Sequence, residues 1–258
     1  MADLTSIWGG LSPHLIAHFY RVEKAKDGTW VKAQEDVTVH APLTESNMEV
    51  SLSWQSPFEN AGSDHGLPTI SAMLQSGSLQ PFFDQGGKAS DFVSKFEGRT
   101  GITKLNSVQV FTGMPPVKIQ VTAMFRAWRD SSGEVEVPFS QLMEWALPQS
   151  LSKDGAILSG LAAVKKVTVN GQSISDETAK GLYPSLTPVC IAMQYKTRLY
   201  SPLVIESIGH PMSSPIDASG QYTELLVPMT LCTLTAFDAP DWRDSRVPSV
   251  FASTRRGM

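Results

Sequence analysis

The sequence predicts an α+β protein that is mainly β. Segments with alternating apolar and polar residues recur along the chain, which is the pattern of half-buried strands. The 258 residues include 19 glycines and 17 prolines, which supply many turns, and helical patterns are few and short. Hydrophobic residues make up 41% of the chain and charged residues 18%, so a sizeable core is expected. This length fits one large domain or two smaller ones.

Charge and cysteine content exclude several functional classes. The net charge of −4 gives no support for a protein that binds nucleic acid or a membrane surface through a basic face. Cys190 and Cys232 lie inside apolar runs and outside any CxxC pair, so we expect two buried free thiols and no metal or redox motif. The N-terminus lacks a secretory pattern, and no apolar run approaches the ~20 residues of a membrane span. We therefore expect a protein of the cytoplasm, unless a particle carries it out.

The first quarter of the chain predicts antiparallel strands after an N-terminal arm at residues 1–13. Residues 15–22 and 30–40 read as two strands, joined by a tight turn at Asp27-Gly28. Residues 48–55 alternate cleanly and predict a half-buried strand. Its expected buried face consists of Met48, Val50, Leu52 and Trp54.

Residues 56–99 predict an excursion out of the sheet. The segment is rich in Gly, Ser, Pro, Asn and Asp, with short helical patterns at 68–75 and 89–96. Such a long loop in a compact domain is usually functional or disordered.

The middle of the chain combines strands with an amphipathic helix. We expect strands at 107–111, 117–128 and 189–195, a second helix at 157–164 and a hairpin at 167–174. The strand at 117–128 should bury Val117, Ile119, Val121, Ala123, Phe125 and Ala127. The helix at 138–147 carries an apolar stripe made of Phe139, Leu142, Met143 and Ala146.

Residues 198–238 dominate the second half. Two apolar runs, 199–208 and 222–237, flank a loop whose Gly, Pro, Ser and Asp residues all favour turns. The second run carries apolar residues on both faces. We therefore expect it to be buried on both sides, within the fold or against a neighbouring subunit. The polar residues after 238 read as a tail.

Candidate sites for chemistry are weak. His14 and His18 are four residues apart, but on a strand this spacing places them ~13 Å apart, and no third metal ligand is apparent. His210, Ser214 and Asp217 are residue types of a hydrolase, yet no GxSxG motif is present and their loop favours turn chemistry. Trp128 and Trp145 are candidates for a carbohydrate groove, although packing in a core or an interface is the simpler explanation. No cofactor is predicted.

Three segments together suggest a family. Residues 105–130, 135–151 and 198–238, about half of the chain, resemble baseplate proteins of contractile-tailed bacteriophages that lie where the tail tube meets the hub. Such proteins share a Ser-Pro-Ile-Asp-x-x-Gly loop, here Ser214, Pro215, Ile216, Asp217 and Gly220. The resemblance implies a tail-tube-like antiparallel β-barrel or sandwich with one or two short helices. Residues 56–99 would be an insertion without a counterpart.

The function implied by this resemblance is structural and non-enzymatic. The chain would form a homo-oligomeric ring, a trimer or hexamer, that connects the tail tube, the hub and the inner baseplate. DNA would be passing cargo only, no membrane would be contacted, and the virion would be assembled in the bacterial cytoplasm. The expected parts are an arm with strands (1–55), the excursion (56–104), the tube-like domain (105–238) and the tail (239–258). The expected interface residues are Ile205, Gly209, Pro211, Ser214, Pro215, Asp217, Gly220 and Leu226.

Two other functions remain open from the sequence. One is a carbohydrate- or peptidoglycan-binding module at a tail tip, which would use Trp128 and Trp145. The other is a hydrolase with His210, Ser214 and Asp217.

Overall fold

The computed structural model describes residues 2–34, 37–55, 108–151 and 185–247. The chain divides into two compact units, one of residues 1–50 with 116–258 and one of residues 51–115. Strands from the expected parts 1–55 and 105–238 therefore lie in the same unit. The elements expected at 68–75, 89–96, 157–164 and 167–174 lie outside the described residues.

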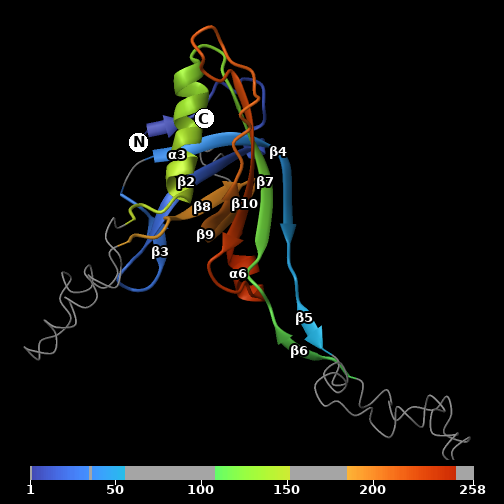
Figure 1. The fold of residues 1–258 in the computed structure, drawn as a ribbon. Coiled ribbons are helices and arrows are strands. Elements are labelled where there is room, and N and C mark those ends of the chain that lie inside the picture. The colour runs from blue at the N-terminus through green and yellow to red at the C-terminus, as the bar shows by residue number, and fades with distance from the viewer. Residues whose placement is uncertain (1, 35–36, 56–107, 152–184, 248–258) are drawn as a thin grey trace, which may run out of the picture. The chain divides into compact units, whose positions relative to one another are not determined.

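The first unit is built on one large, mostly antiparallel sheet (Figure 1). Its strands follow the order β1-β4-β7-β10-β9-β8-β2-β3, and β2 also pairs with β4. Each of the six strands β4, β7, β10, β9, β8 and β2 thus has two partners within this set, and the pairing order returns to β4. The strands are β1 (Ala2–Leu4), β2 (Ile16–Lys24), β3 (Trp30–Lys32), β4 (Val37–Glu49), β7 (Lys118–Arg126), β8 (Cys190–Tyr195), β9 (Arg198–Ile208) and β10 (Glu224–Thr233). The predicted mainly β, α+β class is confirmed.

The N-terminal residues are more ordered than an arm. Strand β1 pairs in parallel with β4, with Asp3 opposite Thr38, and a short 3-10 helix, η1 (Pro13–Leu15), precedes β2. The predicted turn at Asp27-Gly28 is present, because Gly28 adopts φ 90° and its N–H donates to Ala25 O at 3.0 Å. The single strand expected at 30–40 is instead divided between β3 and β4.

One face of the sheet forms the core. In β7, Ile119, Val121, Ala123 and Phe125 are buried, as their alternation predicts. In β10, Leu225, Val227, Met229 and Leu231 are buried, while Leu226 and Pro228 between them are exposed. Of the two expected covers for this strand, burial of both faces within the fold is therefore wrong, because its alternate side chains point away from the core. Cover by a neighbouring subunit stays a prediction.

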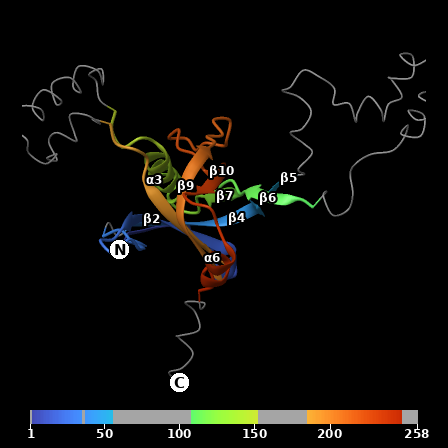
Figure 2. The same cartoon turned by 90° about the horizontal axis from the view of Figure 1, so that it is seen from below.

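Helix α3 (Val137–Ala146) covers part of the core and follows a π-helical turn, η3 (Ser132–Glu136). It contacts β9 and β4, and Figure 2 shows it beside β9. Its most buried apolar side chains are Phe139, Leu142 and Trp145. Met143 and Ala146 of the predicted stripe are only partly buried, so the helix is rotated toward Trp145 relative to the expectation.

The segment after residue 238 begins as a helix rather than a tail. Helix α6 (Ala239–Asp244) opens with a capping box, in which the Asp238 side chain accepts from Asp241 N and the Asp241 side chain accepts from Asp238 N. The Arg198 guanidinium stacks on Trp242, 3.4 Å from the ring centroid, and donates to Trp242 O at 2.9 Å. These contacts hold α6 on the start of β9.

The second unit contains a described two-stranded antiparallel sheet, of β5 (Ser53–Gln55) and β6 (Val110–Gly113). Trp54 and Phe111 pack with ring centroids 5.4 Å apart, yet both side chains are about half exposed. The expected buried face of residues 48–55 is therefore wrong for Val50, Leu52 and Trp54, all of which are exposed. No helix in the described part of the chain is long and apolar enough to cross a membrane.

Candidate functional site

The outward side of β4, β7, β10 and β9 carries a polar surface, which we call the polar face. Strand register places Asn47 opposite Gln120 and Gln120 opposite Thr230, and Thr230 opposite Ser207. The next row places Glu45 opposite Thr122, and Thr122 opposite Pro228. On β7 and β10 the residues of these two rows alternate with buried core residues. The alternation that turns every second side chain of these strands into the core therefore turns the remaining side chains onto this surface.

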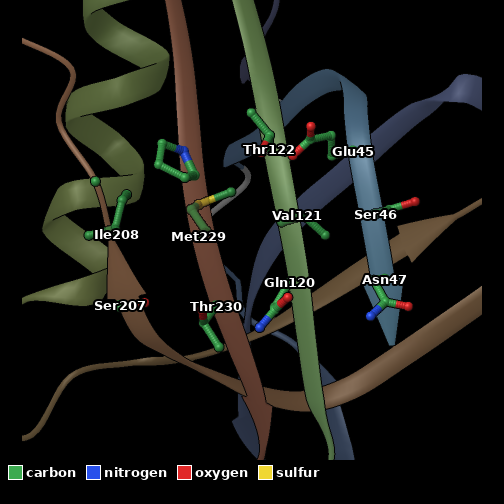
Figure 3. A pocket seen from close by; sticks show the side chains of 12 residues that line it. Glu45, Ser46, Asn47, Gln120, Val121, Thr122, Ser207, Ile208, Met229 and Thr230 are labelled. Atoms are coloured by element: carbon green, nitrogen blue, oxygen red, sulfur yellow. Dashed lines mark hydrogen bonds between the residues drawn. The ribbon is translucent and has the colours of Figure 1, made fainter. Parts of the chain in front are cut away.

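The polar face is hollowed into an open groove of about 800 Å³ (Figure 3). The strands β4 and β7 supply Glu45, Asn47 and Gln120, and β10 and β9 supply Thr230 and Ser207. Half of the twelve lining residues carry an amide or a hydroxyl group, and Glu45 is the one charged residue among them. The surface therefore offers hydrogen bonds, between apolar patches, without a concentrated charge. The groove holds no nucleophile and base in contact, and its form suits a wall better than a closed ligand pocket.

Both cations of the polar face are engaged by glutamates. Lys118 Nζ lies 2.7 Å from Glu206 Oε1, and Arg126 Nε donates to Glu224 Oε2 at 2.6 Å. The hydrogen bond and charge of Glu206 raise the pKa of Lys118.

Two further carboxylates give the polar face an excess of negative charge. Glu45 and Glu49 lie on the same outward side of β4 and pair with Thr122 and Lys118 in the register. Two cations therefore stand against four carboxylates on this surface. Each of the two cations is paired with a glutamate, so neither is left unpaired to bind the phosphate backbone of a nucleic acid.

Gly209 joins the predicted loop to one edge of the polar face. Its N–H donates to Pro228 O at 2.8 Å, and a Cβ added at Gly209 would lie 2.7 Å from Pro228 Cγ. The close approach of loop and β10 therefore requires glycine.

The rest of the loop is built from turns, as the residue types predict. Ser214 N donates to Pro211 O at 3.1 Å, and Thr223 N donates to Pro215 O at 2.9 Å. Gly220 adopts φ 87°, a region that favours glycine. The loop tip is thus closed by its own backbone.

Asp217 organises that tip. Its Oδ1 accepts from Ser219 Oγ at 2.5 Å and from the N–H groups of Ser219 and Gln221 at 2.8 and 3.1 Å. Hydrogen bonds from Ser219 and Ser131 lower the pKa of this carboxyl to about 2. All of these bonds favour the ionised form, which is the behaviour of an anchoring carboxylate.

The three hydrolase-type residues do not form a catalytic relay in the structure. The His210 ring packs between Phe139 at 4.6 Å and Tyr222 at 5.4 Å, centroid to centroid. Asp217 is bonded within its turn. His210 therefore fastens the loop to α3 by ring contacts.

The predicted interface residues fall into four places. Ile205 is 8% exposed and packs in the core opposite Leu231, so its side chain is not at a surface of this chain. Leu226 is 43% exposed on the outward side of β10, beside Met124 of β7. Gly209 edges the polar face, and the remaining five lie in the loop, namely Pro211, Ser214, Pro215, Asp217 and Gly220.

Most of the polar face was missed as a site by sequence reasoning. The polar side of residues 117–128 was visible as alternation, but Asn47, Thr230 and Ser207 join it only through register. That register depends on pairings between distant strands, which no local pattern specifies.

The structure also shows where the other candidate residues lie, namely the histidines, the cysteines and the two tryptophans. His18 faces His40 rather than His14, with ring centroids 4.4 Å apart. Among the described residues no group of three or more His, Cys, Asp and Glu side chains is arranged to hold a metal ion. Cys190 and Cys232 are free and half-buried, and burial raises the pKa of both thiols. Trp128 is 58% exposed, but Trp145 is 5% exposed and unavailable to a carbohydrate.

Comparison with known proteins adds no family: neither a family model nor a curated protein sequence matches this chain.

Proposed function

We propose that this chain is a structural component of a contractile phage tail baseplate, where it forms a ring that connects the tail tube, the hub and the inner baseplate. The observation that carries the proposal is the pairing order that returns to its start through six strands. A tail-tube-like β-barrel is the fold expected from the resemblance of residues 105–130, 135–151 and 198–238. The contacts of α3 with β9 and β4 fit a short helix packed on such a barrel.

The polar face supports a role for this surface as a channel wall. Its amides and hydroxyls make weak contacts with any passing polymer, and its excess of carboxylates repels phosphate. Lys118 and Arg126 are neutralised in place, so they do not retard DNA. In this proposal DNA is cargo that slides along the wall.

Exposed apolar side chains at the loop and on β10 support contacts between neighbours. Met212 and Ile216 in the loop are among the most exposed large apolar residues described, and Leu226 lies beside Met124 on β10 and β7. One such heterologous surface, repeated around a closed ring, suffices to assemble it. A trimer or hexamer is the expected size.

Assembly is tested first by mass photometry and negative-stain microscopy of the purified chain, alone and with its candidate tube protein. We expect rings of defined stoichiometry in at least the second sample. A strictly monomeric chain in both samples would contradict the proposal.

The channel wall is tested separately in assembled particles. Substitution Gln120→Lys places a new cation at the centre of the polar face, and we expect normal rings with slower DNA release. The matched control is Ser12→Lys, which adds the same charge at an exposed position outside the polar face and the loop. Equal release from both variants would remove the channel role from this face while leaving ring formation intact.

A further inference from the structure

Two histidines and one aspartate meet where the N-terminal strand joins the sheet. His18 of β2 and His40 of β4 are directly paired across the two strands, and their rings are 4.4 Å apart in an edge-on arrangement. Asp3 of β1 reaches the same place, with its Oδ1 3.4 Å from His40 Nε2. The cluster therefore joins three strands through titratable groups.

The cluster is built for neutral imidazoles. His40 Nε2 is buried and lacks a well-aligned hydrogen-bond partner. Burial and then the charge of His40 lower the pKa of His18 to about 4, against a smaller opposing effect of Asp3. Burial also lowers the pKa of His40, although Asp3 opposes it, and Lys32 of β3 lowers it further.

We propose that His18, His40 and Asp3 form an acid-sensitive latch, which holds β1 on β4 at neutral pH and releases it when the imidazoles take up protons. Two imidazolium groups at this separation repel each other, and one carboxylate cannot neutralise both. Hydration of the cluster relieves both the repulsion and the cost of burial.

Strand β1 is the element that gives way. It has three residues, it pairs on one side only, and Ala2 and Asp3 are exposed. Strands β2 and β4 each have long pairings on both sides and stay in place. The movement ends at Ser6, which is buried and whose hydroxyl donates to Arg126 O.

The direction and size of the pH effect follow from linkage. A histidine whose pKa is lower in the closed state than in the open state destabilises the closed state as pH falls below the open-state value of ~6.5. The loss grows until the closed-state pKa, about 4 for His18, is reached. If the open state restores the ordinary pKa of His18, the opening constant rises ~20-fold between pH 7 and pH 5.

Hydrogen exchange of the full chain, read by mass spectrometry at pH 7 and pH 5 and corrected for intrinsic rates, tests the latch. We expect the protection of residues 2–5 to fall by ten- to twenty-fold, while peptides of β7 keep theirs. In the double variant His18→Gln with His40→Gln this pH dependence should disappear. The control His210→Gln, which lies outside the cluster, should retain it.

A second variant keeps the proposal falsifiable if the double variant fails to fold. Asp3→Asn removes the carboxylate that raises the closed-state pKa values of both histidines, so the loss of protection between pH 7 and pH 5 should be larger than in the unsubstituted chain. Protection of residues 2–5 that is independent of pH between 7 and 5 would overturn the proposal. A loss of protection that is equal with and without Asp3 would also overturn it.

Discussion

Side chains on the inward and outward sides of β9 and β10 should respond differently to substitution. Ile205→Ala tests the inward side. Ile205 is 8% exposed and packs against the core opposite the fully buried Leu231. Removing its buried methyl and methylene groups should cost about 2–4 kcal/mol of the free energy of unfolding. The matched change Leu226→Ala removes a side chain that is 43% exposed on the outward side of β10, and we expect a loss below ~1 kcal/mol.

Urea unfolding followed by far-UV circular dichroism, at protein concentrations where the chain is monomeric, measures both losses. For a urea slope of ~2–3 kcal/mol/M, Ile205→Ala lowers the midpoint by ~1 M and Leu226→Ala leaves it nearly unchanged. Equal losses would refute the assignment of the two faces.

Substitution by aspartate at the same two positions should block ring assembly for two different reasons. Ile205→Asp should abolish rings because it buries an unpaired charge and unfolds the chain. Leu226→Asp should keep the far-UV spectrum and still block rings. Wild-type rings from Leu226→Asp would remove the outward side of β10 from the proposed interface.

The remaining predictions concern the loop. Gly209→Ala should cost about 1–3 kcal/mol in the same unfolding assay, because its new Cβ meets Pro228 Cγ at 2.7 Å. Gly9→Ala, where a Cβ meets nothing within 4 Å, is the control and should change little. For Asp217 the folded-state pKa is depressed, so its support of the turn is present above ~4, the unfolded value, and is lost as pH falls through about 2. Carboxyl and amide chemical shifts of Asp217 and Ser219 should follow that titration, and a midpoint near ~4 would contradict the bonding of the turn.

Sequence patterns predicted those features that depend on neighbours along the chain. The alternation of residues 117–128 placed Ile119, Val121 and Phe125 in the core correctly, and Asp27-Gly28 gave the turn after β2. The loop at 209–220 followed in the same way from its Gly, Pro and Asp residues. Each of these depends on local backbone geometry or on side-chain period, which a single segment determines.

Features that depend on distant partners were missed. The run 222–237 is apolar on both sides, but composition cannot say which neighbour covers each side, and Leu226 is left outward. Trp54 alternates like a buried residue and is exposed in a two-stranded sheet. His18 was compared with His14 on its own segment, whereas its neighbour is His40 on β4. In each case the pairing of strands decides the environment.

The circuit of strands in the first unit also constrains the order in which the protein can fold during synthesis. Phe19 of β2 pairs with both Val39 of β4 and Met193 of β8. The first partner leaves the ribosome soon after β2, but the second follows only after most of the chain has been translated. Until then β2 has an unpaired edge and an uncovered apolar side, the condition in which nascent strands associate wrongly. We therefore expect folding to be slow and post-translational, and overproduction at reduced temperature or with chaperones to raise the soluble yield.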